Sequence, residues 1–184
     1  MPSDDPAQFV VPDVLTDSER EIGARKQAMD SVVEEALVEY EEDGDQFCYI
    51  EAFQEFLPSF ERILAVGKPA DALALIEYAL ELIETNWETI NNFHIEMEFL
   101  VKDLQNLHHK ACQDLKPDPE KLAKHLFEWA AKSKCGAFRN APKDYASVYG
   151  KEGLEVVWNL ANRDSIQQSA KKAASKDRSK RDSK

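Results

Sequence analysis

The sequence predicts an all-α fold, an antiparallel helical hairpin array of about six or seven helices, arranged as a tetratricopeptide-like superhelix or a compact bundle. Between Lys68 and Lys132, apolar residues recur at spacings of three and four through the segments 69–90, 95–115 and 119–133. Because a helix has about 3.6 residues per turn, each stripe stays on one side and packs against another helix. No segment alternates apolar and polar residues over a useful length, so strands are not expected. The linkers are short, which favours antiparallel neighbours.

The first part of the chain predicts an extended arm followed by one long helix. Residues 1–15 contain three prolines and only short apolar pieces, so they are expected to form an arm without its own element. Thr16 and Glu19 have the spacing of a capping box, which predicts a helix start. The helix is expected to end before Gly44, and a break near Asp30 is an open alternative.

A second helix is expected over 47–66, where aromatic residues recur at helical spacing. Pro58 lies inside this pattern, and because proline removes an amide donor we expect a kink or a restart there. Gly67 suits the left-handed position after a helix, and Pro69 suits the first turn of the next one.

Later boundaries are also marked by turn residues. Asp118 is the expected N-cap of a helix opened by Pro119. Residues 134–141 predict a loop, residues 144–149 a short helical turn, and residues 152–161 a last helix. Residues 16–162 are therefore expected to form a single helical domain.

Charge divides the chain into an acidic body and a basic tail. The net charge is −12, and residues 171–184 contain seven basic and two acidic residues, so the tail carries +5 and the preceding residues −17. A body this acidic disfavours binding to nucleic acid and to anionic membranes, because like charges repel. Residues 163–184 are expected to be disordered or a frayed helix, because they have no aromatic residue and too little apolar surface to offset the entropy of ordering. The tail residues expected to contact phosphates or an acidic partner are Lys171, Lys172, Lys176, Arg178, Lys180 and Arg181.

Sequence motifs favour a protein without a catalytic or metal centre. The three cysteines have no CxxC spacing, and no signal peptide or membrane-spanning stretch is found, so the cytoplasm is the expected location. Phosphate-binding glycine motifs are absent, and no cofactor is expected. His108 and Cys112 are four residues apart and would face the same side of a helix, which is a spacing found in zinc ligand pairs, but a second ligand pair is missing. We therefore expect both to have structural roles.

A groove for a partner is the functional site that the pattern favours most. Helical arrays often bind peptides on a surface lined by aromatic and polar side chains. The residues proposed to line this groove are Tyr49, Phe53, Glu77, Trp87 and His94. The same aromatic residues would equally suit a core, and self-association into a homo-oligomer is a further possibility.

Two motifs resemble a known family. The run KPDPEKLAKHLFEW from Lys116 to Trp129 is followed by Phe138 and then by DYASVYGKEGL from Asp144 to Leu154. This order resembles the helical region of bacterial SWIM zinc-finger family proteins and their finger-less relatives. The resemblance covers roughly residues 45–160 and implies a tetratricopeptide-like hairpin array whose partner is unknown. It does not extend to the zinc finger, because the CxC and CxH pairs are absent.

The leading hypothesis is a non-catalytic helical scaffold or adaptor that binds a protein or peptide partner. The alternative is a nucleic-acid-associated accessory protein that contacts phosphates through its basic tail. A third possibility is a metal-dependent enzyme that uses His108 and Cys112.

Overall fold

The structure, a computed structural model, describes residues 17–44, 47–90, 94–141 and 159, without the side chains of Asp43, His94 and Ile95. Within these residues the chain forms six helices and no strand, which confirms the all-α prediction. The helices are α1 (Asp17–Asp43), α2 (Cys48–Ala65), α3 (Pro69–Thr85), α4 (Trp87–Ile90), α5 (His94–Leu115) and α6 (Pro119–Lys132). None of these helices combines the length and apolarity needed to cross a membrane.

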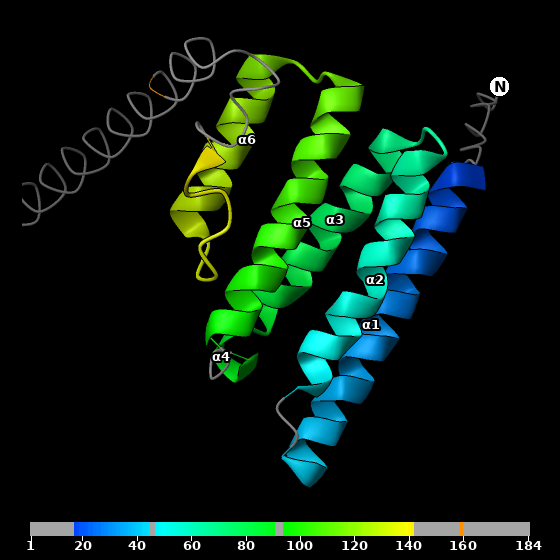
Figure 1. The fold of residues 1–184 in the computed structure, drawn as a ribbon, viewed down its shortest axis with the longest axis vertical. Helices are drawn as coiled ribbons and strands as arrows, with labels where there is room; N and C mark the ends of the chain where they lie inside the picture. The colour runs from blue at the N-terminus through cyan, green and yellow to red at the C-terminus, as the bar shows by residue number, and fades with distance from the viewer. Residues whose placement is uncertain (1–16, 45–46, 91–93, 142–158, 160–184) are drawn as a thin grey trace, which may run out of the picture.

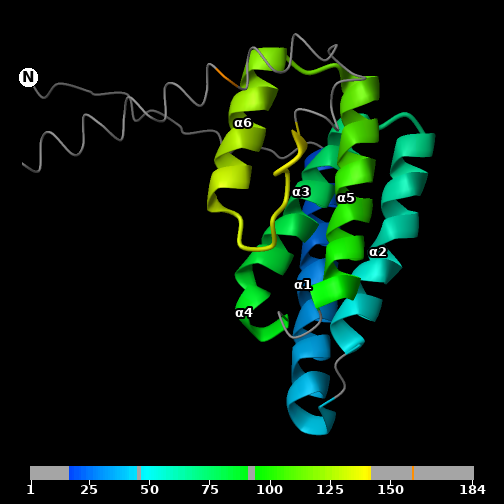
Figure 2. The ribbon, with the colours of Figure 1, turned by 60° about the vertical axis from the view of Figure 1, so that its left-hand side comes forward.

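The five long helices alternate in direction and form antiparallel hairpins (Figure 1). Helix α1 packs on α2 and α3, α2 packs on α3 and α5, and α3 packs on α5. Helices α1 and α2 therefore each contact the next long helix and the one after it, as stacked hairpins do. Helix α6 lies at the end of the array, beside α3 and α5 (Figures 1 and 2).

Helix α3 is the centre of the core. Its buried face has the predicted helical spacing, and Ile76, Leu80 and Ile83 have no exposed surface. Each such side chain contributes about 1.5–3 kcal/mol on burial. The buried faces of α1, α2 and α5 surround this helix, so the apolar stripe recognised in the sequence holds the array together.

Several predicted helix boundaries are confirmed. Gly67 has a φ of +76°, and its amide donates to the carbonyl of Leu64 at 3.0 Å, so it ends α2 in the left-handed conformation. Pro69 begins α3, and the carboxylate of Asp118 accepts the amide of Lys121 at 2.9 Å, which caps α6.

Three features of the helices differ from the sequence predictions or settle alternatives. Helix α1 is continuous past Asp30, and α2 does not restart at Pro58. Pro58 lies on the exposed side of α2, so water can reach the carbonyl of Gln54 that loses its amide donor. The helix expected over 69–90 is divided at Asn86, where the carbonyl of Leu82 accepts both the side-chain amide of Asn86 at 2.9 Å and its backbone amide at 3.1 Å.

Other predicted segments cannot be compared with the structure. The arm 1–15, the turn 144–149, the tail 163–184 and nearly all of the helix 152–161 lie outside the described residues. The loop predicted over 134–141 begins one residue earlier, at Ser133, because α6 ends at Lys132, and only Ala141 at its end is helical.

Candidate functional site

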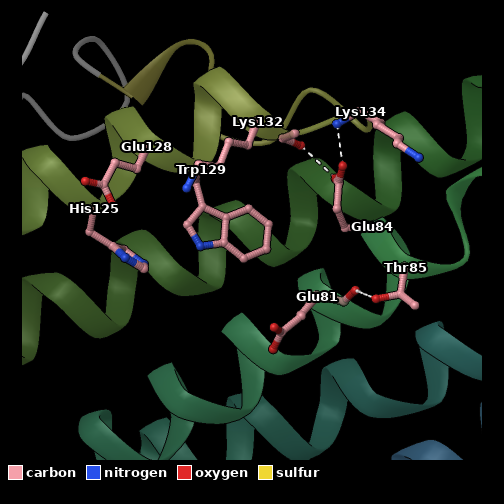
Figure 3. Close-up of a pocket in the computed structure, with 9 residues that line it drawn as sticks. Glu81, Glu84, Thr85, His125, Glu128, Trp129, Lys132 and Lys134 are labelled. Atoms are coloured by element: carbon pink, nitrogen blue, oxygen red, sulfur yellow. Dashed lines mark hydrogen bonds between the residues drawn. The ribbon is translucent and has the colours of Figure 1, made fainter. Parts of the chain in front are cut away.

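A cleft of about 520 Å³ lies between α3 and α6, next to the loop 133–141 (Figure 3). We call it the α3–α6 cleft. Helix α3 forms one wall, helix α6 forms the facing wall, and the start of the loop closes one end. The lining residues are Glu81, Glu84, Thr85, His125, Glu128, Trp129, Lys132, Ser133 and Lys134.

Phe138 connects the loop to the two helices beside it. Its side chain is buried, and its ring centroid lies 4.9 Å from that of His108 on α5 and 5.8 Å from that of Trp129 on α6. Phe138 has a φ of +62°, an uncommon conformation for a residue with a side chain, and Gly136 has a φ of +79°. These two left-handed residues turn the loop back so that an aromatic ring packs between α5 and α6.

Glu84 holds the start of the loop against α3. Its carboxylate accepts the hydroxyl of Ser133 at 2.9 Å and the amides of Lys134 and Cys135 (Figure 3). Burial alone would raise the pKa of Glu84, but these hydrogen bonds outweigh it and lower the pKa. The carboxylate is therefore ionised and occupied by the loop, and this wall of the cleft is preformed.

A second hydrogen-bonded group, which we call the Glu77 cluster, consists of Glu77 on α3, His108 and Cys112 on α5, and His125 on α6. Oε1 of Glu77 accepts a hydrogen bond from Nε2 of His108 and another from Nε2 of His125, both at 3.0 Å. Sγ of Cys112 lies 3.7 Å from Nδ1 of His108, so the thiol can donate to the nitrogen that carries no proton. The cluster joins three helices through one carboxylate.

Burial and hydrogen bonding set the charges in the Glu77 cluster. Burial would raise the pKa of Glu77, but the bonds from both imidazoles lower it to about 2. Burial lowers the pKa of His108, whose side chain is 0% exposed, so this imidazole stays neutral. The bond to Glu77 raises the pKa of His125, whose side chain is 41% exposed and lines the α3–α6 cleft. The ionised carboxylate of Glu77 therefore accepts hydrogen bonds from one buried imidazole and one half-exposed imidazole.

The thiols near the cleft are poor nucleophiles in this arrangement. Burial raises the pKa of Cys112 to about 12 and that of Cys135 to about 11. The thiolate is the reactive form of cysteine, so neither side chain is activated at neutral pH.

The structure corrects part of the predicted groove. Tyr49 and Phe53 are each 1% exposed and Trp87 is 8% exposed, so all three belong to the core. Their aromatic rings follow the buried sides of α2 and α4, where a partner has no access. Glu77 has a side chain that is 31% exposed and belongs to the Glu77 cluster behind the cleft. The side chain of His94 lies outside the described residues.

The two metal candidates are close together, but no metal site forms around them among the described residues. His108 and Cys112 are 0% exposed, and within the described residues no group of three or more histidine, cysteine or acidic side chains has a geometry suited to a metal ion. The tail residues proposed for phosphate contacts (Lys171, Lys172, Lys176, Arg178, Lys180 and Arg181) lie outside the described residues.

Sequence reasoning did not identify the residues of the cleft. His125 and Trp129 are four residues apart on α6 and share one side of that helix, which is the one local signal for this wall. The facing residues Glu81 and Glu84 are more than forty positions away in the chain, and nothing in their local pattern differs from an ordinary solvated helix face.

A scan against protein-family models and searches of curated proteins and of solved structures found no match to this chain. The resemblance of the 116–154 region to SWIM zinc-finger family proteins therefore stays a prediction.

Proposed function

We propose that this protein is a non-catalytic interaction module that binds an exposed segment of a partner protein in the α3–α6 cleft. The observation that carries the proposal is the cleft itself, which combines a half-buried indole with charged side chains from two helices. Its volume of about 520 Å³ suits one or two side chains of a peptide. The proposed tetratricopeptide-like resemblance is consistent with this role.

Trp129 is the expected centre of the interface. Tryptophan residues in partly enclosed pockets often contribute most of the binding free energy of an interface. The edge-to-face contact with Phe138 fixes the indole, and the bonds of Glu84 fix the adjacent loop. Because the walls are already held in place, little conformational entropy would be lost on binding.

The contacts of the polar groups support binding rather than catalysis. The two thiols near the cleft have raised pKa values, and Nε2 of His125 donates to Glu77. These groups stabilise the packing of α3, α5 and α6. A cytoplasmic location remains part of the proposal, since Cys112 and Cys135 are free thiols.

A peptide-display selection against the full-length protein tests this function. Selected peptides should bind the wild type and the Phe99→Leu variant equally, and should bind Trp129→Leu at least about ten-fold more weakly. Phe99 is a suitable control because it is an exposed aromatic residue on α5 and does not line the cleft. Circular dichroism would establish that both variants are folded. The proposal is wrong if no peptide is selected, or if the selected peptides bind folded Trp129→Leu as well as the wild type.

A further inference from the structure

We propose that the α3–α6 cleft recognises an arginine side chain, with the guanidinium over the indole of Trp129 and between the carboxylates of Glu81 and Glu128. This inference rests on the proposed function and specifies the chemistry of the partner: an exposed segment that carries arginine. Three independent features of the cleft support it, namely its unused carboxylates, the state of its cations, and the position of the indole.

The carboxylates of the cleft differ in whether they are already engaged. Glu84 accepts hydrogen bonds from the loop. Glu77, behind the cleft, accepts hydrogen bonds from the imidazoles of His108 and His125. Glu81 on α3 and Glu128 on α6 are exposed, and neither forms an ion pair with another described residue. Figure 3 shows Glu128 beside Trp129 on α6 and Glu81 on the facing helix α3. The cleft therefore presents two unused anionic acceptors from two different walls.

The cations of the cleft neutralise only part of this charge. Lys134 is paired with Glu88, with 2.8 Å between its Nζ and the carboxylate oxygen, so its charge is already balanced. Lys132 is the remaining lysine of the lining, one helical turn beyond Glu128. Glu84 keeps its negative charge, because the groups that donate to it are a hydroxyl and amides. Counting Glu81, Glu84, Glu128 and Lys132 leaves a charge of −2 when His125 is neutral. The acidic body, which carries −17 before residue 171, adds a long-range attraction for cationic partners.

The indole explains why arginine is favoured over lysine. A guanidinium is planar and weakly hydrated, so it stacks on an aromatic face while its edge donates hydrogen bonds to carboxylates. An ammonium group holds its water more strongly and cannot stack in this way. The half-buried Trp129 offers such a surface in the cleft, with Glu128 beside it on α6 and Glu81 on the facing wall.

The test is an NMR titration of the full-length protein that follows the indole N–H signal of Trp129, assigned by its loss in Trp129→Leu. The probe is a blocked Gly-Arg-Gly peptide, and the matched control replaces arginine with citrulline, which has nearly the same shape but no charge. We expect a saturable shift with the arginine peptide, about ten-fold weaker binding of the citrulline peptide, and intermediate binding of a lysine peptide. Added salt should weaken the binding of the arginine peptide.

Variants assign the effect to the two carboxylates. Glu81→Gln and Glu128→Gln should each weaken binding of the arginine peptide about three-fold, as expected for partly exposed ion pairs. Glu61→Gln makes the same change at an exposed position of α2 and should have no effect. Equal binding of the arginine and citrulline peptides, or unchanged binding in the double variant Glu81→Gln/Glu128→Gln, would overturn the inference.

The two proposals fail in different ways. If leucine or glutamate peptides shift the Trp129 signal and the arginine peptide does not, the cleft is a binding site but its specificity for arginine is wrong. If none of these peptides shifts the signal and the display selection also yields no binder, both proposals are wrong.

Discussion

Replacing Glu77 by glutamine tests whether one carboxylate holds α3, α5 and α6 together. The substitution keeps the shape of the side chain and an oxygen that can accept hydrogen bonds, but it removes the negative charge. Oε1 of Glu77 accepts from Nε2 of His108 and of His125, both at 3.0 Å, so two charge-assisted bonds become neutral ones. We therefore expect a less stable fold with an unchanged helix content.

The expected loss of stability is about 2 kcal/mol at pH 7. A hydrogen bond to a charged group contributes about 1 kcal/mol more than a neutral one, and Glu77 makes two such bonds. The fall in the pKa of Glu77 from 4.5 to about 2 corresponds to about 3 kcal/mol. That figure is an upper limit, because 31% of the side chain is exposed to water.

Urea unfolding followed by circular dichroism measures the effect, and Glu81→Gln is the matched control. Glu81 lies one turn further along α3, is exposed, and has no ion pair with a described residue. We expect Glu81→Gln to change the free energy of unfolding by less than about 0.5 kcal/mol.

The pH dependence gives a second test of the same reasoning. The pKa of Glu77 is depressed in the folded state, so its contribution is present above the unfolded pKa of 4.5 and is lost as the pH falls towards 2. The difference between wild type and Glu77→Gln should therefore shrink between pH 5 and pH 3. Equal stabilities of Glu77→Gln and Glu81→Gln at pH 7 would refute the structural role assigned to this carboxylate.

Four further predictions concern the same region and the core. Hydrogen bonding to Glu77 raises the pKa of His125 in the folded state. The resulting stabilisation is present below the unfolded pKa of 6.5 and is lost as the pH rises through the folded pKa. In urea unfolding, the free energy of unfolding of wild type should therefore exceed that of His125→Asn by more at pH 6 than at pH 8. Cys112 is buried with a pKa of about 12, so iodoacetamide should modify it only after unfolding, as peptide mass spectrometry would show. Glu84→Ala should increase hydrogen exchange at the amide of Lys134, because the carboxylate that accepts this amide is removed. Phe53→Ala should cost about 3–5 kcal/mol in the free energy of unfolding, because its side chain is 1% exposed.

Each of these predictions has an outcome that would contradict it. A constant difference for His125→Asn across the pH range would mean that its protonation is not linked to folding. Rapid alkylation of native Cys112, or unchanged exchange at Lys134 in Glu84→Ala, would contradict the described packing and loop contact. A stable Phe53→Ala variant would return this residue to the surface groove expected from the sequence.

Local residues were enough to predict most helix ends. Gly67 and Pro69 mark a stop and a start because their backbone preferences act within one turn, and the cap at Asp118 depends on an amide three residues away. The interruption at Asn86 has no signal in the apolar pattern, because the stripe continues past it to Ile90. The spacing of apolar residues shows which face of a helix is buried, but it does not show where the helix is interrupted.

The candidate site was much less predictable than the fold. Tyr49 and Phe53 have the same helical spacing whether they face a groove or a core, and only the packing of α2 against its neighbours places them inside. Conversely, Trp129 belongs to an apolar stripe and packs on Phe138, yet it is only partly buried and lines the cleft. Burial depends on which helix lies opposite, and this information is not local.

By itself, the sequence determined an all-α protein with antiparallel hairpins, because hydrophobic period and turn residues act over a few positions. Only the tertiary structure decided that Glu77 joins His108 and His125, which lie 31 and 48 positions further along the chain. The same packing opened a cleft between α3 and α6. Contacts between distant segments arise from how helices stack, and hydrophobic patterns specify which faces are buried without specifying which polar groups will meet.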